Sequence, residues 1–419
     1  MNKVDVMIIG AGIAGLGAAL RAREVHREAV IFEAKERAGG LLDNFELNGF
    51  RFDNAVHLSF ASEPEVRKIF DQTDYYTHPS DALNFEEKRW LKHPVQNNLY
   101  PLPVEQKVEL IKSFLRRTES ESSDYESWLR HQYGDAISER FPIRYTLKYW
   151  GTPASNLSTT WIGNRMRRAE LDEILLGAFT DETPNTYYTK EMRYPKTGGF
   201  RAFIEPLIAL TTIEYNNQAS KIDLENKIVT FKDGKKVQYT TLISSIPLPV
   251  LVSITNNISE KVKKAAESLV ATSIDLISVG FNKKIIKDLW FYIYDDDILA
   301  SRAYSPSVKS PENAPKGCSS LQFEIYSRGT ESKYSKEQLI ENVLYALDKM
   351  NIATKEDICF IHHKHLTYGN VVFDKGMEKC RDVVRNYFSS KGVKTIGRFG
   401  EWDYLWSNQS LLSGYNAIK

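Results

Sequence analysis

The sequence predicts an α/β fold in three parts, which are discontinuous along the chain. An apolar run, Val4 to Ile9, leads through a glycine-rich turn into a helix and a second apolar run, and this is how a βαβ unit begins. The stretch from about 100 to 190 carries mainly helical patterns, and strand patterns dominate from about 273 to 372. We therefore expect a βαβ-based domain, a helical domain and a mainly antiparallel sheet domain.

The first unit is predicted from its apolar residues. Val4 to Ile9 is rich in Val and Ile, as expected for a strand that is buried on both faces. Leu16 to Glu24 is predicted to form a helix, and Ala29 to Phe32 a second buried strand that ends at Glu33. The turn between the first strand and the helix carries three glycines.

Two helices are predicted in the middle of the chain. Pro101 to Arg117 has apolar residues at helical spacing and a charged outer face. Asp124 to Gly134 is a shorter helix, closed by its final glycine. This region has no glycine-rich cofactor motif of its own.

Strand patterns return after residue 213. Asp233-Gly234 lies between two alternating runs, Lys227 to Phe231 and Lys236 to Leu242, which is the pattern of a β-hairpin. The other predicted elements are the strands Leu276–Phe281, Trp290–Tyr294 and Leu321–Tyr326, the helix Lys336–Met350, the short strand Thr395-Ile396, the turn Gly397–Gly400 and a helical tail from about Ser410.

The order of these patterns predicts the domain limits. Residues 1–95, 195–265 and 385–419 are expected to form the nucleotide-binding domain. Residues 100–190 are expected to form the helical domain, and residues 270–384 the mainly antiparallel sheet domain that contacts substrate.

Composition excludes several classes of protein. The chain has 419 residues, of which 42% are hydrophobic and 26% charged, and no segment approaches the length of a membrane span. The net charge of +1 gives no sign of a nucleic-acid-binding surface. An anionic ligand would therefore have to be bound by arginines at its own site. We expect a cytoplasmic protein. The three cysteines have no metal-ligand spacing, and His362, His363 and His365 are predicted to be strand residues, so we expect no metal site.

The glycine turn predicts a dinucleotide site. Gly10 permits the tight turn, Gly12 lets the backbone approach a pyrophosphate, and Gly15 lets the helix pack close to the strand. The N-terminus of the helix offers free N–H groups to the phosphates. Glu33 follows the second strand, where an acid can accept a hydrogen bond from a ribose hydroxyl. This pattern alone leaves FAD and NAD open.

Two further motifs favour FAD. The segment Glu36-Arg37-Ala38-Gly39-Gly40 and the segment Gly397-Arg398-Phe399-Gly400 resemble the flavin-contacting segments of the FAD-dependent amine oxidase and mutase superfamily. The resemblance implies FAD as the cofactor. The residues that it and the glycine turn assign to the cofactor are Gly10, Gly12, Ile13, Ala14, Gly15, Glu33, Ala34, Arg37, Gly39, Gly40, Leu41, His57, Gly397, Arg398, Asn408, Gln409 and Ser410.

Within that superfamily the chain resembles the UDP-galactopyranose mutases, most of all the eukaryotic type. The motifs are Trp161-Ile162-Gly163-Asn164-Arg165, with Trp150 15 residues before the arginine; Tyr292 and Arg302, ten apart; Gly397 to Tyr404, continuing to Asn408-Gln409; and His57 after Arg51-Phe52-Asp53. The resemblance implies that Arg165 and Arg302 hold the substrate diphosphate and that His57 lies beside the flavin. It assigns Trp150, Thr146, Trp161, Tyr292, Asn370, Tyr404 and Asn408 to the substrate.

Residue chemistry agrees with these roles. Two guanidinium forks match the acceptors of a diphosphate, tyrosine hydroxyls add hydrogen bonds, and a Trp offers a flat apolar face to a uracil ring. Three positions depart from the family. Ala55-Val56 replace glycines before the histidine, Thr146 stands for an asparagine near the uracil, and Asn370-Val371 replace a tyrosine and proline. These departures leave the base and the sugar open.

The resemblance implies a nucleotide-sugar pyranose–furanose mutase that acts in cell-surface polysaccharide biosynthesis. Its reaction would convert UDP-galactopyranose to UDP-galactofuranose, or a related nucleotide sugar in the same way. Reduced FAD would attack the anomeric carbon through N5, with no net redox change, and NAD(P)H or another reductant would prime it. A conventional flavin oxidase or desaturase is the alternative hypothesis within the superfamily. A non-catalytic flavoprotein is a third hypothesis. The sequence leaves the oligomeric state open.

Overall fold

The first sheet has seven strands, and its parallel centre begins the chain. The computed structural model describes residues 2–118, 121–163, 166, 170–184 and 191–419. The strand order is β10-β11-β12-β1-β2-β9, and β18 also pairs with β12. The strands are β1 (Asn2–Ile9), β2 (Ala29–Phe32), β9 (Thr212–Glu214), β10 (Ala219–Asp223), β11 (Ile228–Phe231), β12 (Lys236–Ser244) and β18 (Val393–Thr395). The predicted βαβ start and the hairpin at Asp233-Gly234 are confirmed.

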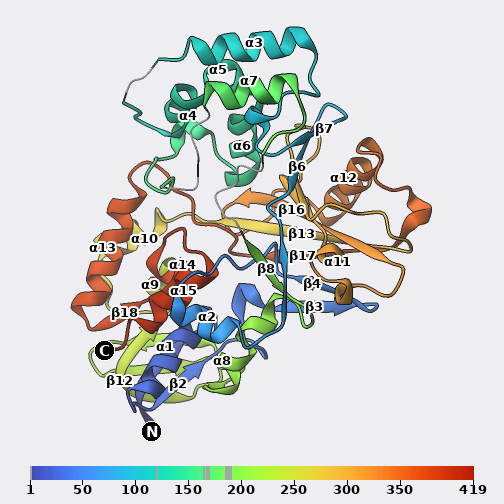
Figure 1. Ribbon diagram of the computed structural model, residues 1–419. Coiled ribbons are helices and arrows are strands. Elements are labelled where there is room, and N and C mark those ends of the chain that lie inside the picture. The colour runs from blue at the N-terminus through green and yellow to red at the C-terminus, as the bar shows by residue number, and fades with distance from the viewer. Residues whose placement is uncertain (1, 119–120, 164–165, 167–169, 185–190) are drawn as a thin grey trace.

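Two helices from opposite ends of the chain pack together beside this sheet. They are α1 (Ile13–Glu24) and α15 (Ser407–Tyr415). A Cβ added at Gly414 would lie 1.8 Å from the carbonyl oxygen of Ala14, so the glycine allows the two backbones to approach. Figure 1 shows the blue N-terminal segment and the red C-terminal segment next to each other at the lower end of the molecule.

The second sheet also has seven strands and is mainly antiparallel. Its order is β17-β13-β16-β15-β14-β6-β7, and only the β14–β6 pair is parallel within the described chain. The strands are β6 (Ala82–Glu86), β7 (Arg89–Lys92), β13 (Thr272–Phe281), β14 (Trp290–Ile293), β15 (Arg302–Tyr304), β16 (Ser319–Arg328) and β17 (Ile358–Leu366). Residues 82–92 therefore pair with this sheet, although we expected them within the nucleotide-binding domain, because no apolar pattern distinguishes which sheet an edge hairpin joins. The predicted helix α12 (Lys336–Lys349) packs against β13 and β17.

A group of helices covers one end of the molecule (Figure 1). These are α3 (Val104–Leu115), α4 (Tyr125–Tyr133), α5 (Asp135–Ser138), α6 (Arg144–Trp150) and α7 (Leu171–Phe179), with a π-helical turn over Glu139–Ile143. Asp124 caps α4 by accepting a hydrogen bond from the backbone N–H of Ser127, 2.9 Å away, and Gly134 follows its last turn. The helix α6 contacts β16, so this group adjoins the second sheet.

Further helices and short strands lie outside the two seven-stranded sheets. They are β3 (Asn44–Leu47), β4 (Phe50–Asp53), α2 (Pro64–Phe70), β5 (Tyr75–His78), β8 (Met192–Pro195), α8 (Glu205–Ala209), α9 (Leu248–Ser253), α10 (Glu260–Glu267), α11 (Pro306–Lys309), α13 (Met377–Ser390) and α14 (Gly397–Glu401). The predicted turn Gly397–Gly400 is thus a short helix. The predicted α/β fold is confirmed. No helix among the described residues is long and apolar enough to cross a membrane.

Candidate functional site

A cavity of about 630 Å³ lies where the two sheets and the C-terminal segment meet. Its walls come from the β1–α1 turn, the loop after β4, the second sheet and α14. Sixteen of the residues that the sequence assigned to cofactor or substrate line it: Gly10, Gly12, Ile13, Ala14, Glu33, Gly39, Gly40, Leu41, His57, Tyr292, Arg302, Asn370, Gly397, Arg398, Tyr404 and Ser410. The fold therefore brings together motifs from the whole length of the chain.

One end of the cavity is formed by the glycine turn. Gly10 has φ +97°, a left-handed conformation that favours glycine. A Cβ at Gly15 would lie 2.0 Å from the carbonyl oxygen of Gly10, so this glycine allows close helix–strand packing. A Cβ at Gly12 would meet no described protein atom within 4 Å, so the space beside it belongs to the cavity. These three environments match the three separate roles that the sequence predicts.

Glu33 is 92% buried at the same end, since its exposed fraction is 8%. Its two carboxylate oxygens accept hydrogen bonds from the backbone N–H groups of Ala11, at 2.7 Å, and Lys35, at 2.9 Å. An acid fixed in this way beside an open helix N-terminus is what an adenosine ribose and a pyrophosphate require.

The two glycines after Glu33 complete this wall. Gly39 and Gly40 both have positive φ values, +119° and +58°. Gly39 forms an isolated bridge with Gly12, and a Cβ at Gly40 would lie 3.3 Å from the Cα of Gly12. The two glycine segments thus form one cradle without side chains, and the cradle fits a dinucleotide cofactor such as FAD.

Several residues assigned to the cofactor lie outside the cavity walls. Arg37 pairs with Asp43, 2.9 Å away. Gln409 accepts a hydrogen bond from the Trp406 backbone N–H at 2.9 Å and so caps α15. Asn408, assigned to cofactor and substrate, donates to Glu63 at 2.8 and 3.1 Å. Ala34 is likewise absent from the cavity lining as far as the structure describes it.

His57 lies in the loop after β4, at the cavity wall. Its Nε2 is 2.9 Å from the Leu41 carbonyl oxygen and 3.0 Å from that of Asn54, so it is placed to donate to them. Burial lowers the pKa of His57 to about 4, and the nearby Asp53 carboxylate opposes the shift only in part. The imidazole is therefore neutral at neutral pH.

The same cavity is lined by Arg302, at the start of β15. Its Nε donates to the carboxylate of Glu324, which is fully buried, and its Nη2 donates to the Tyr326 hydroxyl at 3.1 Å. The guanidinium carbon lies 5.4 Å from the ring centroid of Tyr149. Burial by itself would lower the pKa of Arg302, but the Glu324 carboxylate holds that pKa well above its usual value. The guanidinium therefore stays charged.

Tyrosine side chains surround this guanidinium. The hydroxyl of Tyr149, in α6, lies 3.2 Å from that of Tyr404, and both residues line the cavity, as do Tyr292 and Tyr326. A hydroxyl can donate to an anion without adding charge. One arginine and several hydroxyls therefore form a site that can bind an oxyanion.

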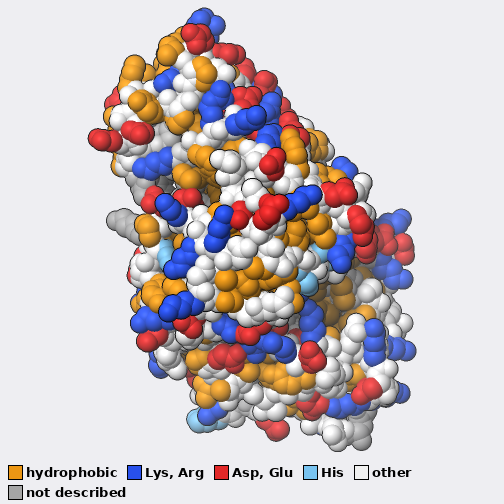
Figure 2. Space-filling view, turned by 90° about the vertical axis from the view of Figure 1, so that its right-hand side faces the viewer, with side chains coloured by type: hydrophobic (Ala, Val, Ile, Leu, Met, Phe, Trp, Pro, Cys, Tyr) orange, Lys and Arg blue, Asp and Glu red, His pale blue; other side chains and the backbone are white. Residues whose placement is uncertain are grey.

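Arg398 supplies a second guanidinium to the cavity. It donates from Nε and Nη2 to the carbonyl oxygen of Leu405, at 2.9 and 2.8 Å, and lies 5.6 Å from the ring centroid of Tyr404. These partners are neutral, in contrast to the carboxylate that faces Arg302. Figure 2 shows basic and acidic side chains mixed over the face that it presents, and the net charge of the chain is +1, so recognition of an anion depends on such local groups.

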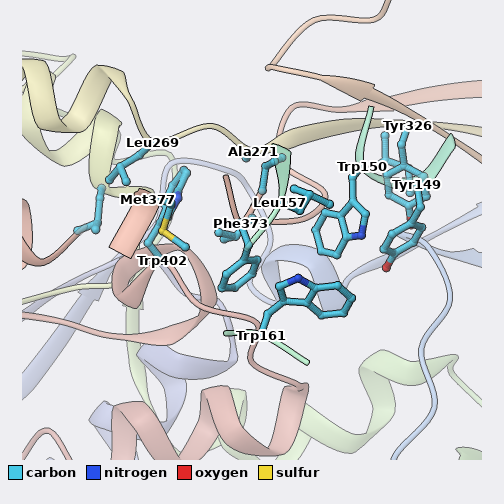
Figure 3. Packing of buried hydrophobic residues seen from close by; sticks show 14 of the residues in the cluster. Tyr149, Trp150, Leu157, Trp161, Leu269, Ala271, Tyr326, Phe373, Met377 and Trp402 are labelled. Carbon is cyan, nitrogen blue, oxygen red and sulfur yellow. The ribbon is translucent and has the colours of Figure 1, made fainter. Parts of the chain in front are cut away.

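Three residues assigned to substrate lie in the core instead. Trp150 is 3% exposed, and its ring centroid lies 5.4 Å from that of Trp161, which is 8% exposed. Figure 3 shows the Trp150 indole between Tyr149 on one side and Phe373 on the other. Thr146 is 2% exposed and donates to the Pro142 carbonyl oxygen at 2.6 Å. An aromatic residue that stacks on a base and one that fills a core have the same sequence pattern, so spacing could not separate them.

Arg165, the first predicted diphosphate arginine, lies outside the described residues. The predicted pair of converging arginines is therefore represented here by Arg302 alone. The predicted strand residues His362, His363 and His365 lie in β17, and no cluster of potential metal ligands is found in the described part of the chain.

Sequence reasoning missed the residues that hold this site together. Glu324 and Tyr326 alternate along β16 on the same face, and a buried carboxylate two residues from a tyrosine in an apolar strand is the signal that could have found them. Asp53 and Lys309 form a fully buried ion pair of 3.1 Å behind the His57 loop. Lys309 is 256 residues from Asp53, and nothing in their local patterns connects them.

The fold and this cavity define the class of protein. The family model of flavin containing amine oxidoreductases matches residues 13–385, and the chain belongs to this family. More particularly, the chain is similar to UDP-galactopyranose mutase: the crystal structure of that enzyme in its reduced form superposes with a TM-score of 0.93 at 26% identity, over 99% of this chain and 95% of that one. Cyclohexylamine oxidase from Brevibacterium oxydans shares the fold, with a TM-score of 0.71 at 14% identity over 99% of this chain and 98% of that one.

Curated relatives match only parts of the chain. Protoporphyrinogen oxidase 2 of Arabidopsis thaliana is 28% identical over 115 residues, 27% of this chain and 22% of that protein. All-trans-retinol 13,14-reductase of Danio rerio is 25% identical over 180 residues, 39% of this chain and 27% of that protein. The matched regions thus span less than a third of these relatives' length.

Proposed function

We propose that the protein is an FAD-dependent mutase that interconverts the pyranose and furanose forms of a nucleotide-diphosphate sugar, with UDP-galactose as the first sugar nucleotide to test. The observation that carries the proposal is the Arg302 guanidinium among cavity-lining tyrosines, in the same cavity as the dinucleotide cradle. The similarity to UDP-galactopyranose mutase over the whole chain supports it.

The residues of the chain would divide the work as follows. The cradle of Gly12, Gly39 and Gly40, with Glu33, would hold the cofactor. FAD, when bound and reduced, would supply a nucleophile for the anomeric carbon. Arg302 would bind the departing diphosphate and stabilise the charge that develops on it. The hydroxyls of Tyr149 and Tyr404 would complete the oxyanion site and keep the diphosphate close for its return.

The cofactor must be reduced for this reaction, and NAD(P)H is the proposed reductant. Enzyme reduced with dithionite and incubated with UDP-galactose under argon should yield a second sugar nucleotide on ion-exchange chromatography. Oxidised enzyme in air serves as the control and should yield none. A panel of UDP-, dTDP- and GDP-sugars would then identify the base and the sugar, which Thr146 and Asn370 leave open.

A second candidate is a conventional oxidase or desaturase. The family model of flavin containing amine oxidoreductases and the match to an all-trans-retinol 13,14-reductase favour it, because both names denote redox enzymes. Such an enzyme would change the redox state of its substrate on every turnover. Turnover that requires O2 and no nucleotide sugar would support this candidate, and product formation by the anaerobic reduced enzyme would reject it.

A further inference from the structure

A single buried carboxylate connects the two halves of the cavity. Glu324, on β16, is fully buried, and its two oxygens have different partners. Oε2 accepts hydrogen bonds from Arg302 Nε and from the Tyr326 hydroxyl, the latter at 2.7 Å. Oε1 accepts from the backbone N–H of Val56 at 2.6 Å. The carboxylate thus joins the guanidinium of the proposed anion site to the loop beside the flavin cradle.

The contact with Glu324 also orients Arg302. The carboxylate takes the Nε–H, and the Tyr326 hydroxyl takes one N–H of Nη2. Nη1 and the second N–H of Nη2 are left without an acceptor among the described residues. Since these groups form the outer edge of the guanidinium and the residue lines the cavity, that edge is available for two oxygens of an anion.

The loop that contains Val56, the donor to Glu324 Oε1, is under backbone strain. Ala55 has φ +76°, which costs an L-residue about 1–2 kcal/mol relative to its usual conformations. The loop is held on both sides of this residue. Asp53 is fixed by the Tyr194 hydroxyl at 2.8 Å and by Lys309 at 3.1 Å, whereas Val56 is held by Glu324. Glu324 therefore holds Val56 directly, and the next residue, His57, is held in addition by the carbonyl oxygens of Leu41 and Asn54.

We infer that Glu324 is a positioning residue that transmits anion binding at Arg302 to the loop 53–57 and so to the flavin. When an anion draws the guanidinium into the cavity, the hydrogen bond from Nε to Oε2 lengthens. The negative charge of Glu324 is then less neutralised, and its Oε1 binds the Val56 N–H more strongly. The inference rests on the proposed function in one respect only, namely that the ligand of Arg302 is an anion.

The test uses the full-length holoprotein and inorganic pyrophosphate, the anion that Arg302 would hold whatever base or sugar is attached. Pyrophosphate binding is measured by calorimetry, and its effect on the flavin by the visible absorption spectrum of bound FAD. In the unaltered protein, pyrophosphate should bind and should shift that spectrum. In Glu324→Gln the FAD content should be unchanged and pyrophosphate should still bind, within about tenfold of the original affinity, but the spectral shift should be lost.

The reason is that an amide presents only one acceptor oxygen. In Glu324→Gln, either Arg302 Nε or the Val56 N–H faces an NH2 group instead of an oxygen, so the connection is broken on one side. Glu324→Asp keeps the charge but shortens the side chain, and it should lose the shift as well; it serves if the glutamine variant does not fold.

Two outcomes would overturn the inference. One is a spectral shift of unchanged amplitude in both Glu324 variants. The other is a flavin spectrum of the unaltered protein that does not change when pyrophosphate is added, whether or not calorimetry shows that pyrophosphate binds. A spectral response to pyrophosphate combined with no conversion of any nucleotide sugar would instead reject the proposed function and leave the role of Glu324 standing.

Discussion

The hydroxyl groups of Tyr149 and Tyr404 lie 3.2 Å apart, although 255 residues separate them in the chain. Tyr149 belongs to the helical group at one end of the molecule, and Tyr404 follows the helix α14 at the cofactor cavity. Burial raises the pKa of Tyr149 well above its usual value, so its hydroxyl keeps its proton and remains a donor. The Tyr149 ring centroid lies 5.4 Å from the Arg302 guanidinium carbon and the Tyr404 ring centroid 5.6 Å from that of Arg398, so the pair of hydroxyls lies between two cavity arginines.

Replacing Arg302 should weaken anion binding without releasing the cofactor. In Arg302→Ala the dissociation constant for UDP should rise by about 30-fold or more, because a buried, charge-assisted contact is lost. Calorimetry with UDP and the ratio of FAD absorbance to protein absorbance measure the two effects.

Arg302→Lys is the matched control, since it keeps the charge and still pairs with the buried Glu324 but loses the planar fork. We expect an affinity between those of the alanine variant and the unaltered protein. Loss of FAD from either variant at unchanged thermal stability would mean that Arg302 serves the cofactor instead of the substrate.

The glycine turn offers a pair of substitutions with opposite consequences. Gly12→Ala adds a methyl group to open space in the cavity, so the apoprotein should keep its melting temperature while FAD binding is lost. Gly15→Ala adds a methyl group 2.0 Å from the Gly10 carbonyl oxygen, so the apoprotein itself should be destabilised by about 1–3 kcal/mol. Thermal melts of both apoproteins and FAD titrations distinguish the two. A Gly12→Ala variant that retained FAD would show that the cofactor does not approach this turn.

Ala55→Gly should make the protein more stable. Ala55 adopts φ +76°, and glycine has no penalty there, although it adds entropy to the unfolded chain. The net gain should be about 0.5–1 kcal/mol in urea unfolding. Ala19→Gly, within α1, is the control and should lose stability. An Ala55→Gly variant as destabilised as the control would contradict the left-handed conformation at this loop.

The histidine beside the cradle should make stability depend on acidity. The folded-state pKa of His57 is about 4, below its ordinary value of 6.5, so the unfolded chain binds a proton more readily than the folded one. The contribution of neutral His57 is complete above about pH 6.5 and is lost as the pH falls through 4. In urea unfolding between pH 7 and pH 4.5, His57→Gln should therefore lose less stability than the unaltered protein. Equal losses would show that His57 titrates normally.

The buried position of Trp150 predicts that it supports the fold and not the ligand. Trp150→Ala should destabilise the protein by about 3–5 kcal/mol, because it leaves a large hole in the aromatic cluster. Trp150→Phe retains more of the packing and should leave the affinity for UDP unchanged, whereas Tyr149→Phe, which removes a cavity hydroxyl, should reduce it. Weaker UDP binding in Trp150→Phe than in Tyr149→Phe would restore the base-stacking role that the sequence suggested.

The parts of the fold that depend on local pattern could be predicted. The strand β2 begins and ends where its apolar run does, and α12 has the expected amphipathic spacing with a capping box at Ser335. The environments of Gly10, Gly12 and Gly15 also follow from a rule that acts over a few residues. The pairing of residues 82–92 with the second sheet depends on contacts with β14, more than 190 residues away, and no local pattern carries that information.

In the candidate site, too, residues in local motifs could be predicted and residues that act through distant partners could not. Arg302 and Tyr292 were found because a resemblance preserves their spacing, and the structure places both at the cavity. Lys309 acts through Asp53, which only folding brings to it, so it could not be recognised from the sequence, whereas Glu324 had a local signal in the apolar strand β16 that was overlooked. Trp150 was assigned to the ligand because the sequence identifies an aromatic residue but does not show whether its ring packs against protein or against a ligand.

The close contact of α1 with α15 has a consequence for the order in which the molecule matures. Gly17 and Gly414 allow the two backbones to touch, and the cavity takes walls both from the glycine turn and from the segment 397–410. A growing polypeptide on the ribosome has the first wall hundreds of residues before the second. Secure capture of the flavin must therefore wait until α15 has emerged, and until then the unpaired strand edges of the incomplete sheet leave the nascent protein prone to aggregation.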